Sequence, residues 1–252
     1  MKKKQIIIAG PCAAESEVQI RISLKEAKKR KVDFVRICLW KPRTKPGFDG
    51  LGEKAVNLLI EAAKMGLNPA TEVLIPSQAE FVIKKVLGAV PKAKLLLWIG
   101  ARNQNHCIQR DIAKACAKDM RVYLMIKNQP WVSEDHWEGI VGHVLHGGMS
   151  KDRIIVCHRG FTPNGVNPHG FRNMPDYEMA IRMKAKTGLP ILFDPSHVGG
   201  TVENVLKTAK DAAKYGFDGL VIEVHHDPKN ALTDAKQQLT WSEFDKLMST
   251  VS

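Results

Sequence analysis

The feature that most constrains the fold is a regular alternation of short apolar runs with longer helix-like segments. Apolar runs rich in β-branched and aromatic residues predict eight strands, at residues 6–9, 34–40, 69–74, 94–99, 122–127, 153–157, 190–193 and 219–223. Segments with a helical spacing of apolar residues follow these strands, at 17–31, 52–65, 77–87, 107–118, 133–147, 174–186, 202–215 and from about 242. Strands that alternate with helices in this way form a parallel sheet.

Eight such units in 252 residues match the size of a (β/α)₈ TIM barrel. The main alternative, a doubly wound sheet, would need a glycine-rich GxGxxG turn after an early strand, and the sequence has none. No linker or low-complexity segment interrupts the alternation. We therefore predict a single α/β barrel over residues 1–252, with no added regulatory domain.

Composition and charge indicate which kinds of molecule this protein could bind. Hydrophobic residues make up 44% and charged residues 25%, as in an ordinary soluble protein, and no apolar run is long enough to span a membrane. The formal net charge of +12 suits anionic small molecules, whereas no nucleic-acid-binding motif is present. The 5 cysteines form no CxxC pair and the N-terminus lacks a signal-peptide pattern, so we expect free thiols and a cytoplasmic location.

The sequence FVRICLWKPRT at 34–44 places cations where a predicted buried strand ends. A buried parallel strand should be a nearly continuous apolar run, yet Arg36 interrupts this one, and Lys41, Arg43 and Lys45 follow. Burying a guanidinium is costly unless an anion lies beside it. A carboxylate of the protein could supply that anion for Arg36 alone. The whole group of cations is better explained by a ligand that carries phosphate or carboxylate groups.

The carboxyl ends of the other predicted strands are also unusually polar. In a TIM barrel these ends meet on one face, which carries the chemistry. The polar residues at or just after them are Cys12, Lys41, Arg43, Glu72, Arg102, Lys127, His158, Arg159, Asp194, Ser196, His197, Glu223, His225 and His226. The cations of this face would repel one another unless dianions lay between them, so we infer one or two phosphorylated, carboxylated ligands.

A second group of residues combines the ligand types that transition metals favour. Its members are Cys12, His197, Glu223 and Asp234. Thiolate, imidazole and carboxylate groups together suit Zn, Fe, Mn or Co. Other interpretations stay open, because the four residues lack the close spacing of a zinc finger. Cys12 could be a small buried hydrophobic residue, His197 a general base, and Glu223 the partner of one of the cations.

Ten short motifs follow one another along the chain, most of them at these strand ends. They are AGPC at 9–12, WKPRT at 40–44, TEV at 71–73, IGARN at 99–103, IKN at 126–128, HRG at 158–160, FRN at 171–173, DPSH at 194–197, IEVH at 222–225 and TDAKQQ at 233–238. In wording and order they resemble the metal-dependent type I 3-deoxy-D-arabino-heptulosonate 7-phosphate (DAHP) synthases. The nearest resemblance is to the branch that often carries a chorismate mutase domain.

The resemblance implies condensation of phosphoenolpyruvate with erythrose 4-phosphate to DAHP and phosphate, the first step of the shikimate pathway to aromatic amino acids. It places around phosphoenolpyruvate Arg36, Lys41, Ala101, Arg102, Lys127 and Arg159. It places around erythrose 4-phosphate Lys41, Pro42, Arg43 and Thr44. It implies one divalent metal ion (Mn, Fe, Zn or Co) bound by Cys12, His197, Glu223 and Asp234. The catalytic residues would be Lys41, Glu72, Lys127 and His197, with Glu72 and Lys127 near the water that adds at C2.

Two other functions stay open at this point. The sister family, 3-deoxy-D-manno-octulosonate 8-phosphate (KDO8P) synthase, typically has KANRS where this chain has KPRT. An enzyme of that kind, or a variant from secondary metabolism, would keep the mechanism and change the aldose. A barrel that binds sugar phosphates without turnover is the other alternative, and the intact set of metal ligands argues against it. We further expect a homo-oligomer, a dimer or tetramer, and regulation by a separate partner protein stays open.

Overall fold

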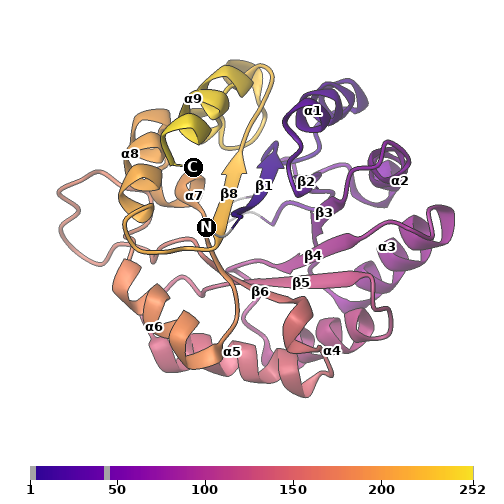
Figure 1. Ribbon diagram of the computed structural model, residues 1–252, viewed down its shortest axis with the longest axis horizontal. Coiled ribbons are helices and arrows are strands. Elements are labelled where there is room, and N and C mark those ends of the chain that lie inside the picture. Colours follow the sequence, from indigo (N-terminus) through magenta and orange to yellow (C-terminus); the bar gives the residue numbers. More distant parts are fainter. Residues whose placement is uncertain (1–3, 43–45, 252) are drawn as a thin grey trace.

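Eight parallel strands close into a barrel in the computed structural model, which describes residues 4–42 and 46–251 (Figure 1). The strands are β1 (Ile6–Gly10), β2 (Phe34–Arg36), β3 (Pro69–Glu72), β4 (Leu95–Ile99), β5 (Val122–Lys127), β6 (Ile154–His158), β7 (Ile191–Phe193) and β8 (Gly219–Glu223). Each strand pairs with its neighbours in sequence, and β1 closes the ring by pairing with β8. The predicted TIM barrel is confirmed.

Helices surround the barrel and carry the chain from one strand to the next (Figure 1). They are α1 (Glu17–Arg30), α2 (Val56–Lys64), α3 (Pro76–Ala89), α4 (His106–Ala117), α5 (Glu134–His146), α6 (Tyr177–Thr187), α7 (Pro195–Gly199), α8 (Val202–Ala212) and α9 (Trp241–Val251). Short 3-10 turns are η1 (Gly52–Ala55), η2 (Lys151–Arg153), η3 (Pro228–Asn230) and η4 (Ala235–Gln237). Among the described residues, no helix is both long and apolar enough to cross a membrane.

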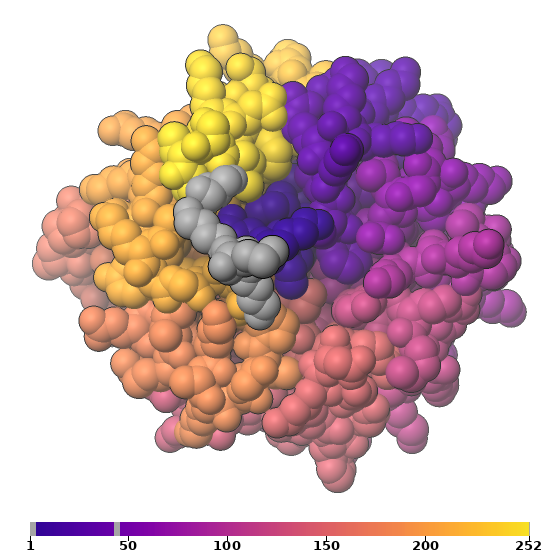
Figure 2. All heavy atoms as spheres, viewed as in Figure 1, coloured from indigo at the N-terminus to yellow at the C-terminus, as the bar shows by residue number. Residues whose placement is uncertain are grey.

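The two ends of the sequence meet where the ring of helices closes. In Figure 2 the yellow C-terminal segment lies beside the indigo N-terminal one. The contact is polar and aromatic: Arg30 of α1 bonds both carboxylate oxygens of Asp245 in α9, and its guanidinium lies 5.0 Å from the ring centre of Trp241. The last helix therefore completes the outer ring of the barrel.

The ends of α1 show how the sequence sets a helix in place. The hydroxyl of Ser16 accepts a hydrogen bond from the backbone N–H of Gln19 at 3.1 Å, as the predicted N-cap requires. At the other end Lys31 adopts a left-handed conformation, with φ of 53°, and its N–H bonds two carbonyls of the last turn. The basic residues of this last turn also complement the negative end of the helix dipole.

The core has two apolar layers because side chains alternate along each strand. In β4, Leu95, Leu97 and Ile99 pack outward against the helices, whereas Leu96 and Trp98 point into the barrel. All five are buried. The interior layer ends at Trp98, directly below the face that was predicted to carry the chemistry.

The prediction of one strand over 34–40 is wrong in its second half, since β2 ends at Arg36. The N–H of Ile37 still bonds a β3 carbonyl, but the N–H of Leu39 donates to the side chain of Thr71 at 3.1 Å. The N–H of Lys41 bonds the carbonyl of Asp49 in the following loop at 2.6 Å. These local partners turn the chain away from the sheet, so the cations follow a loop above the barrel rather than the end of a long strand.

The helix α7 was not predicted. It is a short helix directly after β7, and its N-cap Asp194 accepts a hydrogen bond from the backbone N–H of His197 at 3.0 Å. Pro195 occupies the first helical position, where its missing N–H costs nothing. The sequence DPSH is therefore a complete capped turn, and it fixes His197 relative to Asp194.

Candidate active site

The carboxyl-end face of the barrel brings together the predicted site residues that the structure describes. A cavity there is lined by Arg36, Lys41, Pro42, Glu72, Trp98, Gly100, Ala101, Arg102, Lys127, Arg159 and His197. The predicted metal ligands Cys12, Glu223 and Asp234 form a cluster that Arg36 and Lys41 link to this cavity. The predicted aldose-phosphate residues Arg43 and Thr44 lie outside the described residues.

Arg36 connects the two groups of side chains. It is 2% exposed, and its Nη2 donates to Oε1 of Glu223 at 2.9 Å and to the carbonyl of Cys12 at 3.2 Å. Its Nε donates to the carbonyl of Pro11 at 3.0 Å. Its Nη1 is buried and has no partner among the described residues. The protein therefore supplies a carboxylate for Arg36, as the simpler interpretation had it, and still leaves the two N–H groups of Nη1 for a ligand.

Lys127 and His197 share one carboxylate. Asp194 Oδ2 accepts from Lys127 Nζ at 2.7 Å and from His197 Nδ1 at 2.8 Å, and all three side chains are buried. Burial alone would raise the pKa of Asp194, but His197 and Lys127 hold that pKa well below its usual range. An ionised Asp194 thus fixes Lys127 at the cavity wall and turns the other nitrogen of His197 toward the metal ligands.

Arg159 is a buried cation without a carboxylate. It is 6% exposed, and its guanidinium donates to the amide oxygen of Asn173 at 2.9 Å. Within 4 Å it forms no ion pair with any described residue. Burial lowers the pKa of Arg159 to about 10 against the opposing effect of the Asp194 carboxylate, and the cations Arg172 and Arg102 act in the same direction as burial. The side chain remains charged at neutral pH, so the cavity holds positive charge that an anionic ligand would neutralise.

Glu72 lines the same cavity and is held close to the backbone of Gly100. Its Oε2 accepts from the indole Nε1 of Trp98 at 3.1 Å. A Cβ atom added to Gly100 would lie 2.0 Å from Oε1 of Glu72, so only glycine leaves room for this carboxylate. The indole of Trp98 also lies 5.5 Å from the guanidinium of Arg36 and 5.9 Å from Nζ of Lys127. Trp98 therefore forms the floor on which the charged side chains are arranged.

The predicted metal ligands form a compact donor set. One ligand atom each from Cys12, Glu223 and Asp234 lies within 4.8 Å of the other two. The fourth predicted ligand, His197, directs its Nε2 toward this group and lies 3.7 Å from Oε1 of Glu223. One sulfur, one nitrogen and two carboxylates are a donor set that suits a divalent transition metal.

The protonation of this set is consistent with a cation site. Burial lowers the pKa of His197 to about 4, so the ring is neutral at pH 7, and with Nδ1 bonded to Asp194 its Nε2 can act as a ligand. Burial and the nearby Glu223 raise the pKa of the Cys12 thiol well above its usual value. The thiol accordingly donates to Oδ2 of Asp234 at 3.3 Å, and a bound cation would take the place of that proton.

Asp234 is held in an uncommon backbone conformation. Its φ of 45° is left-handed, a region that aspartate visits more readily than most residues. The preceding Thr233 is fixed by two hydrogen bonds to Glu15, from its N–H at 3.0 Å and from its hydroxyl at 2.9 Å. Lys41 Nζ lies 3.2 Å from Oδ2 and Arg172 lies 3.1 Å from Oδ1. Against the effect of burial, these cations and His197 hold the pKa of Asp234 far below its usual range.

The whole described chain matches one family. The model of the DAHP synthetase I family matches residues 2–252. The chain belongs to this family. A curated member, phospho-2-dehydro-3-deoxyheptonate aldolase of Thermotoga maritima, is 32% identical over 248 residues, which are 96% of this chain and 67% of that protein. A protein with the sister activity is less similar. The 2-dehydro-3-deoxyphosphooctonate aldolase of Paraburkholderia phymatum is 24% identical, and the alignment covers 100% of this chain and 90% of that protein.

Solved structures agree with the family assignment. A crystal structure of the DAHP synthase from Thermotoga maritima superposes with a TM-score of 0.85 at 29% identity, and covers 98% of this chain and 68% of that chain. A truncated form of the same Thermotoga enzyme gives a TM-score of 0.81 at 28% identity, over 98% of this chain and 85% of that chain. The predicted family and barrel are confirmed.

Several residues of the site were not assigned a role from the sequence. Trp98 and Gly100 fix Glu72, Asp194 fixes Lys127 and His197, and Asn173 contacts Arg159. Asp194 and Asn173 belong to the motifs DPSH and FRN, so the sequence marked their positions, but it did not indicate what either side chain contacts. Trp98 could not have been found, because an aromatic residue within an apolar strand is ordinarily part of the core.

Proposed function

We propose that this protein catalyses the condensation of phosphoenolpyruvate with erythrose 4-phosphate, giving DAHP and inorganic phosphate. A bond forms between C3 of phosphoenolpyruvate and the aldehyde carbon, and the aldehyde oxygen takes up a proton. Water adds at C2, and the bond between C2 and the phosphate oxygen breaks, so one water is consumed and one phosphate released. The observation that carries the proposal is a cavity with buried, incompletely paired cations beside an S, N, O donor set.

Phosphoenolpyruvate would bind among the cations of the cavity. Arg36 offers the unpartnered Nη1, and Arg159 has no carboxylate within reach among the described residues. Lys127 is already positioned by Asp194. Guanidinium groups suit the two-oxygen edges of phosphate and carboxylate groups, and Lys127 supplies a further charge. Since these cations are held in place before the ligand arrives, they would stabilise the developing negative charge with little reorganisation.

A divalent metal would bind at Cys12, His197, Glu223 and Asp234. Enzymes of this family depend on a metal, and the compact donor set fits one. When bound, the metal would supply Lewis-acid polarisation of the aldehyde. The surrounding cations would hold the carboxylate ligands in place: Arg36 restrains Glu223, and Lys41 restrains Asp234 at the border of the substrate cavity.

The addition of water at C2 would take place between Glu72 and Lys127. Both line the same cavity, and both contact Trp98, one by a hydrogen bond and one over its ring. A carboxylate held in this position can accept a proton from the attacking water. The ammonium group of Lys127 can stabilise the departing phosphate. These roles for Glu72 and Lys127 remain those that the family resemblance implied.

The choice of aldose rests on the loop after β2. Lys41 and Pro42 line the cavity, and the KPRT sequence continues with Arg43 and Thr44, which we propose hold the phosphate of the four-carbon sugar. The KDO8P synthase-like alternative is kept because proteins with the octonate activity are also relatives of this chain. The sequence KPRT, where KDO8P synthases typically have KANRS, favours the four-carbon aldose.

The proposal is tested by measuring phosphate release from phosphoenolpyruvate with erythrose 4-phosphate or arabinose 5-phosphate, with and without EDTA. We expect turnover with erythrose 4-phosphate, loss of turnover in EDTA, and recovery with Mn²⁺ or Zn²⁺. Preference for arabinose 5-phosphate would support the sister activity. Absence of turnover with either sugar in metal-loaded protein would favour a binding role, and turnover that EDTA does not affect would remove the metal from the proposal.

We also keep the cytoplasmic location and the homo-oligomer, a dimer or tetramer, as proposals. All five cysteines are free and four of them are buried, as expected of a protein made in a reducing compartment. Size-exclusion chromatography with light scattering would test the oligomer. The same measurement with candidate proteins added would test for a separate regulatory partner.

A further inference from the structure

Gln237 lies behind one of the proposed metal ligands. It ends the turn η4 and is only 2% exposed. Its Nε2 donates to Oε2 of Glu223 at 2.6 Å, and its Oε1 accepts from Arg172 at 2.5 Å. Buried amides that use both ends of the side chain hold their neighbours in a fixed geometry. Gln237 belongs to the motif TDAKQQ, but it is neither a predicted metal ligand nor a residue of the proposed mechanism.

The orientation of the Gln237 amide is decided by its two neighbours. A guanidinium can only donate hydrogen bonds, so the group that faces Arg172 must be the carbonyl oxygen. The NH₂ group is then left facing Glu223, an ionised carboxylate that can only accept. Reversing the amide would oppose two donors at one end and two acceptors at the other. Arg172 therefore makes Gln237 a donor to Glu223.

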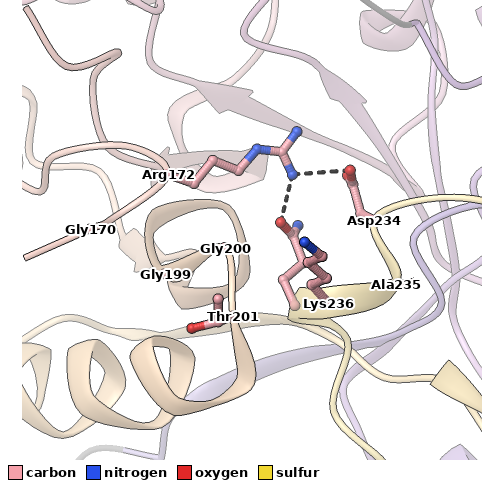
Figure 3. Close-up of a pocket in the computed structure, with 9 residues that line it drawn as sticks. Gly170, Arg172, Gly199, Gly200, Thr201, Asp234, Ala235 and Lys236 are labelled. Carbon is pink, nitrogen blue, oxygen red and sulfur yellow. Dashed lines mark hydrogen bonds and ion pairs between the residues drawn. The ribbon is translucent and has the colours of Figure 1, made fainter. Parts of the chain in front are cut away.

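The two oxygens of Glu223 are held from opposite sides. Arg36 bonds Oε1 at 2.9 Å, and Gln237 bonds Oε2 at 2.6 Å. Arg172 also reaches Asp234, so the link from Glu223 through Gln237 and Arg172 ends on the second carboxylate of the donor set. Figure 3 shows Arg172 pointing toward Asp234, with the ion pair between them. The two carboxylates are thus joined by a chain of hydrogen bonds that does not involve a metal.

We propose that Gln237, oriented by Arg172, is a positioning residue that holds Glu223 in the conformation needed to bind the metal. The inference rests on the metal-dependent function proposed above. Partners of metal ligands fix the ligand conformation, and their removal typically weakens metal binding by about 10–100-fold. Without Gln237, Arg36 would be the one remaining hydrogen-bond donor to the Glu223 carboxylate among the described residues, and the carboxylate could rotate about that contact.

The position of Gln237 gives a second reason for this role. It lines a cavity of about 270 Å³ together with Arg172, Asp234, Lys236 and the Gly199–Thr201 segment. The cavity is large enough to hold several water molecules. Gln237 separates it from Glu223, which is fully buried. Shortening the side chain would let water compete for Glu223, and this would lower the metal affinity further.

The test measures binding of Co²⁺ alone, by competition with a chromophoric chelator and by the absorption of the Co²⁺–thiolate bond to Cys12. Gln237→Met keeps the size of the side chain and removes the amide. Gln237→Asn keeps the amide but is one methylene too short to reach both partners. Gln109→Met is the matched control, because Gln109 is also fully buried and bonds the carbonyl of Asn103 at 2.7 Å, in α4 on another side of the barrel.

We expect both Gln237 variants to bind Co²⁺ about 10–100-fold more weakly, with a shifted thiolate band, and Gln109→Met to bind like the wild type. A folded Gln237 variant with the wild-type dissociation constant would overturn the proposal. So would an equal loss in Gln109→Met, failure of both Gln237 variants to fold, or a wild-type protein that binds no Co²⁺. A wild type that binds Co²⁺ without turnover would refute the proposed function and leave the positioning role of Gln237 in place.

Discussion

The two sides of the active face satisfy their charges in different ways. On the side of β4 to β6, Arg159 is buried, and among the described residues its one side-chain hydrogen-bond partner is the amide oxygen of Asn173. On the side of β1 and β8, the carboxylates are contacted by several donors: Glu223 by Arg36 and Gln237, and Asp234 by Cys12, Lys41 and Arg172. On the first side Lys127 is paired with Asp194 but Arg159 keeps its charge without a described carboxylate in ion-pair contact, whereas the second side is internally connected.

The difference indicates what each side is for. A side that must bind and release anions keeps a buried cation without a carboxylate in contact, and the rest of the fold offsets the cost of burying it. A side that must present ligands in a fixed geometry satisfies its acceptors from within, so that little reorganisation is needed when the cation binds. Substitutions on the side of β1 and β8 should therefore cost stability as well as activity, whereas substitution of Arg159 should cost activity with little loss of stability.

The largest effect on stability is expected from Glu223→Ala. The change leaves the buried guanidinium of Arg36 without its carboxylate, and breaking a buried pair in this way costs about 3–5 kcal/mol. It should also abolish turnover. Urea unfolding of the metal-free protein measures the loss, and Glu80→Ala, at an exposed pair with Lys118, is the control that should hardly change stability. Wild-type stability in Glu223→Ala would contradict the comparison.

Arg159→Met should lose activity without the loss of stability expected for Glu223→Ala. We expect kcat/KM for phosphoenolpyruvate to fall by about 10²–10³-fold, or about 3–4 kcal/mol, with at most a small change in the free energy of unfolding. The control lies at the other end of β6: Arg153 is equally buried and bonds the carbonyls of Asp119 and Val122. Arg153→Met should lose about 1–3 kcal/mol of stability and keep its activity. Equal losses of activity and of stability in Arg159→Met and Arg153→Met would contradict the proposed difference between the two arginines.

Gly100→Ala tests whether the position of Glu72 matters. The new Cβ would overlap Oε1 of Glu72, so the carboxylate must move. We expect kcat to fall by about 10–100-fold with the barrel still folded, because small displacements of a catalytic group are costly. Gly142→Ala in α5 has open space around it, and it should raise stability by about 0.5–1 kcal/mol without a change in kcat. An unchanged kcat in Gly100→Ala would remove Glu72 from the mechanism.

The smallest effect concerns the response to acid. Burial lowers the pKa of His158 to about 3, against about 6.5 in the unfolded chain. Between these values the unfolded state binds the extra proton, so stability falls as the pH drops, by about 1.2 kcal/mol between pH 7 and pH 5.5. His158→Gln keeps an acceptor for the N–H of Asp176, which His158 Nε2 now provides at 2.9 Å. The difference in unfolding free energy between pH 7 and 5.5 should shrink by that amount.

The sequence was sufficient for the architecture because strand and helix periods are local properties. The strands β5 and β8 were predicted to the residue, and most helix ends to within a few residues. The exception, β2, failed because its end is set by partners far away in sequence, such as Thr71 for Leu39. The motifs likewise indicated which residues meet on the carboxyl-end face, because a closed barrel sends all strand ends to the same side.

What the sequence alone determined is therefore the barrel, its family and the identity of the charged residues on one face. Which cation pairs with which carboxylate was decided only by the tertiary structure. Arg36 and Glu223 are 187 residues apart, and Lys41 and Asp234 are 193 apart. No local sequence pattern indicates that Arg36 is paired with a carboxylate while Arg159 forms no ion pair in the described part of the chain. Pairing depends on distances across the closed barrel, and those distances exist only once the eight strands have met.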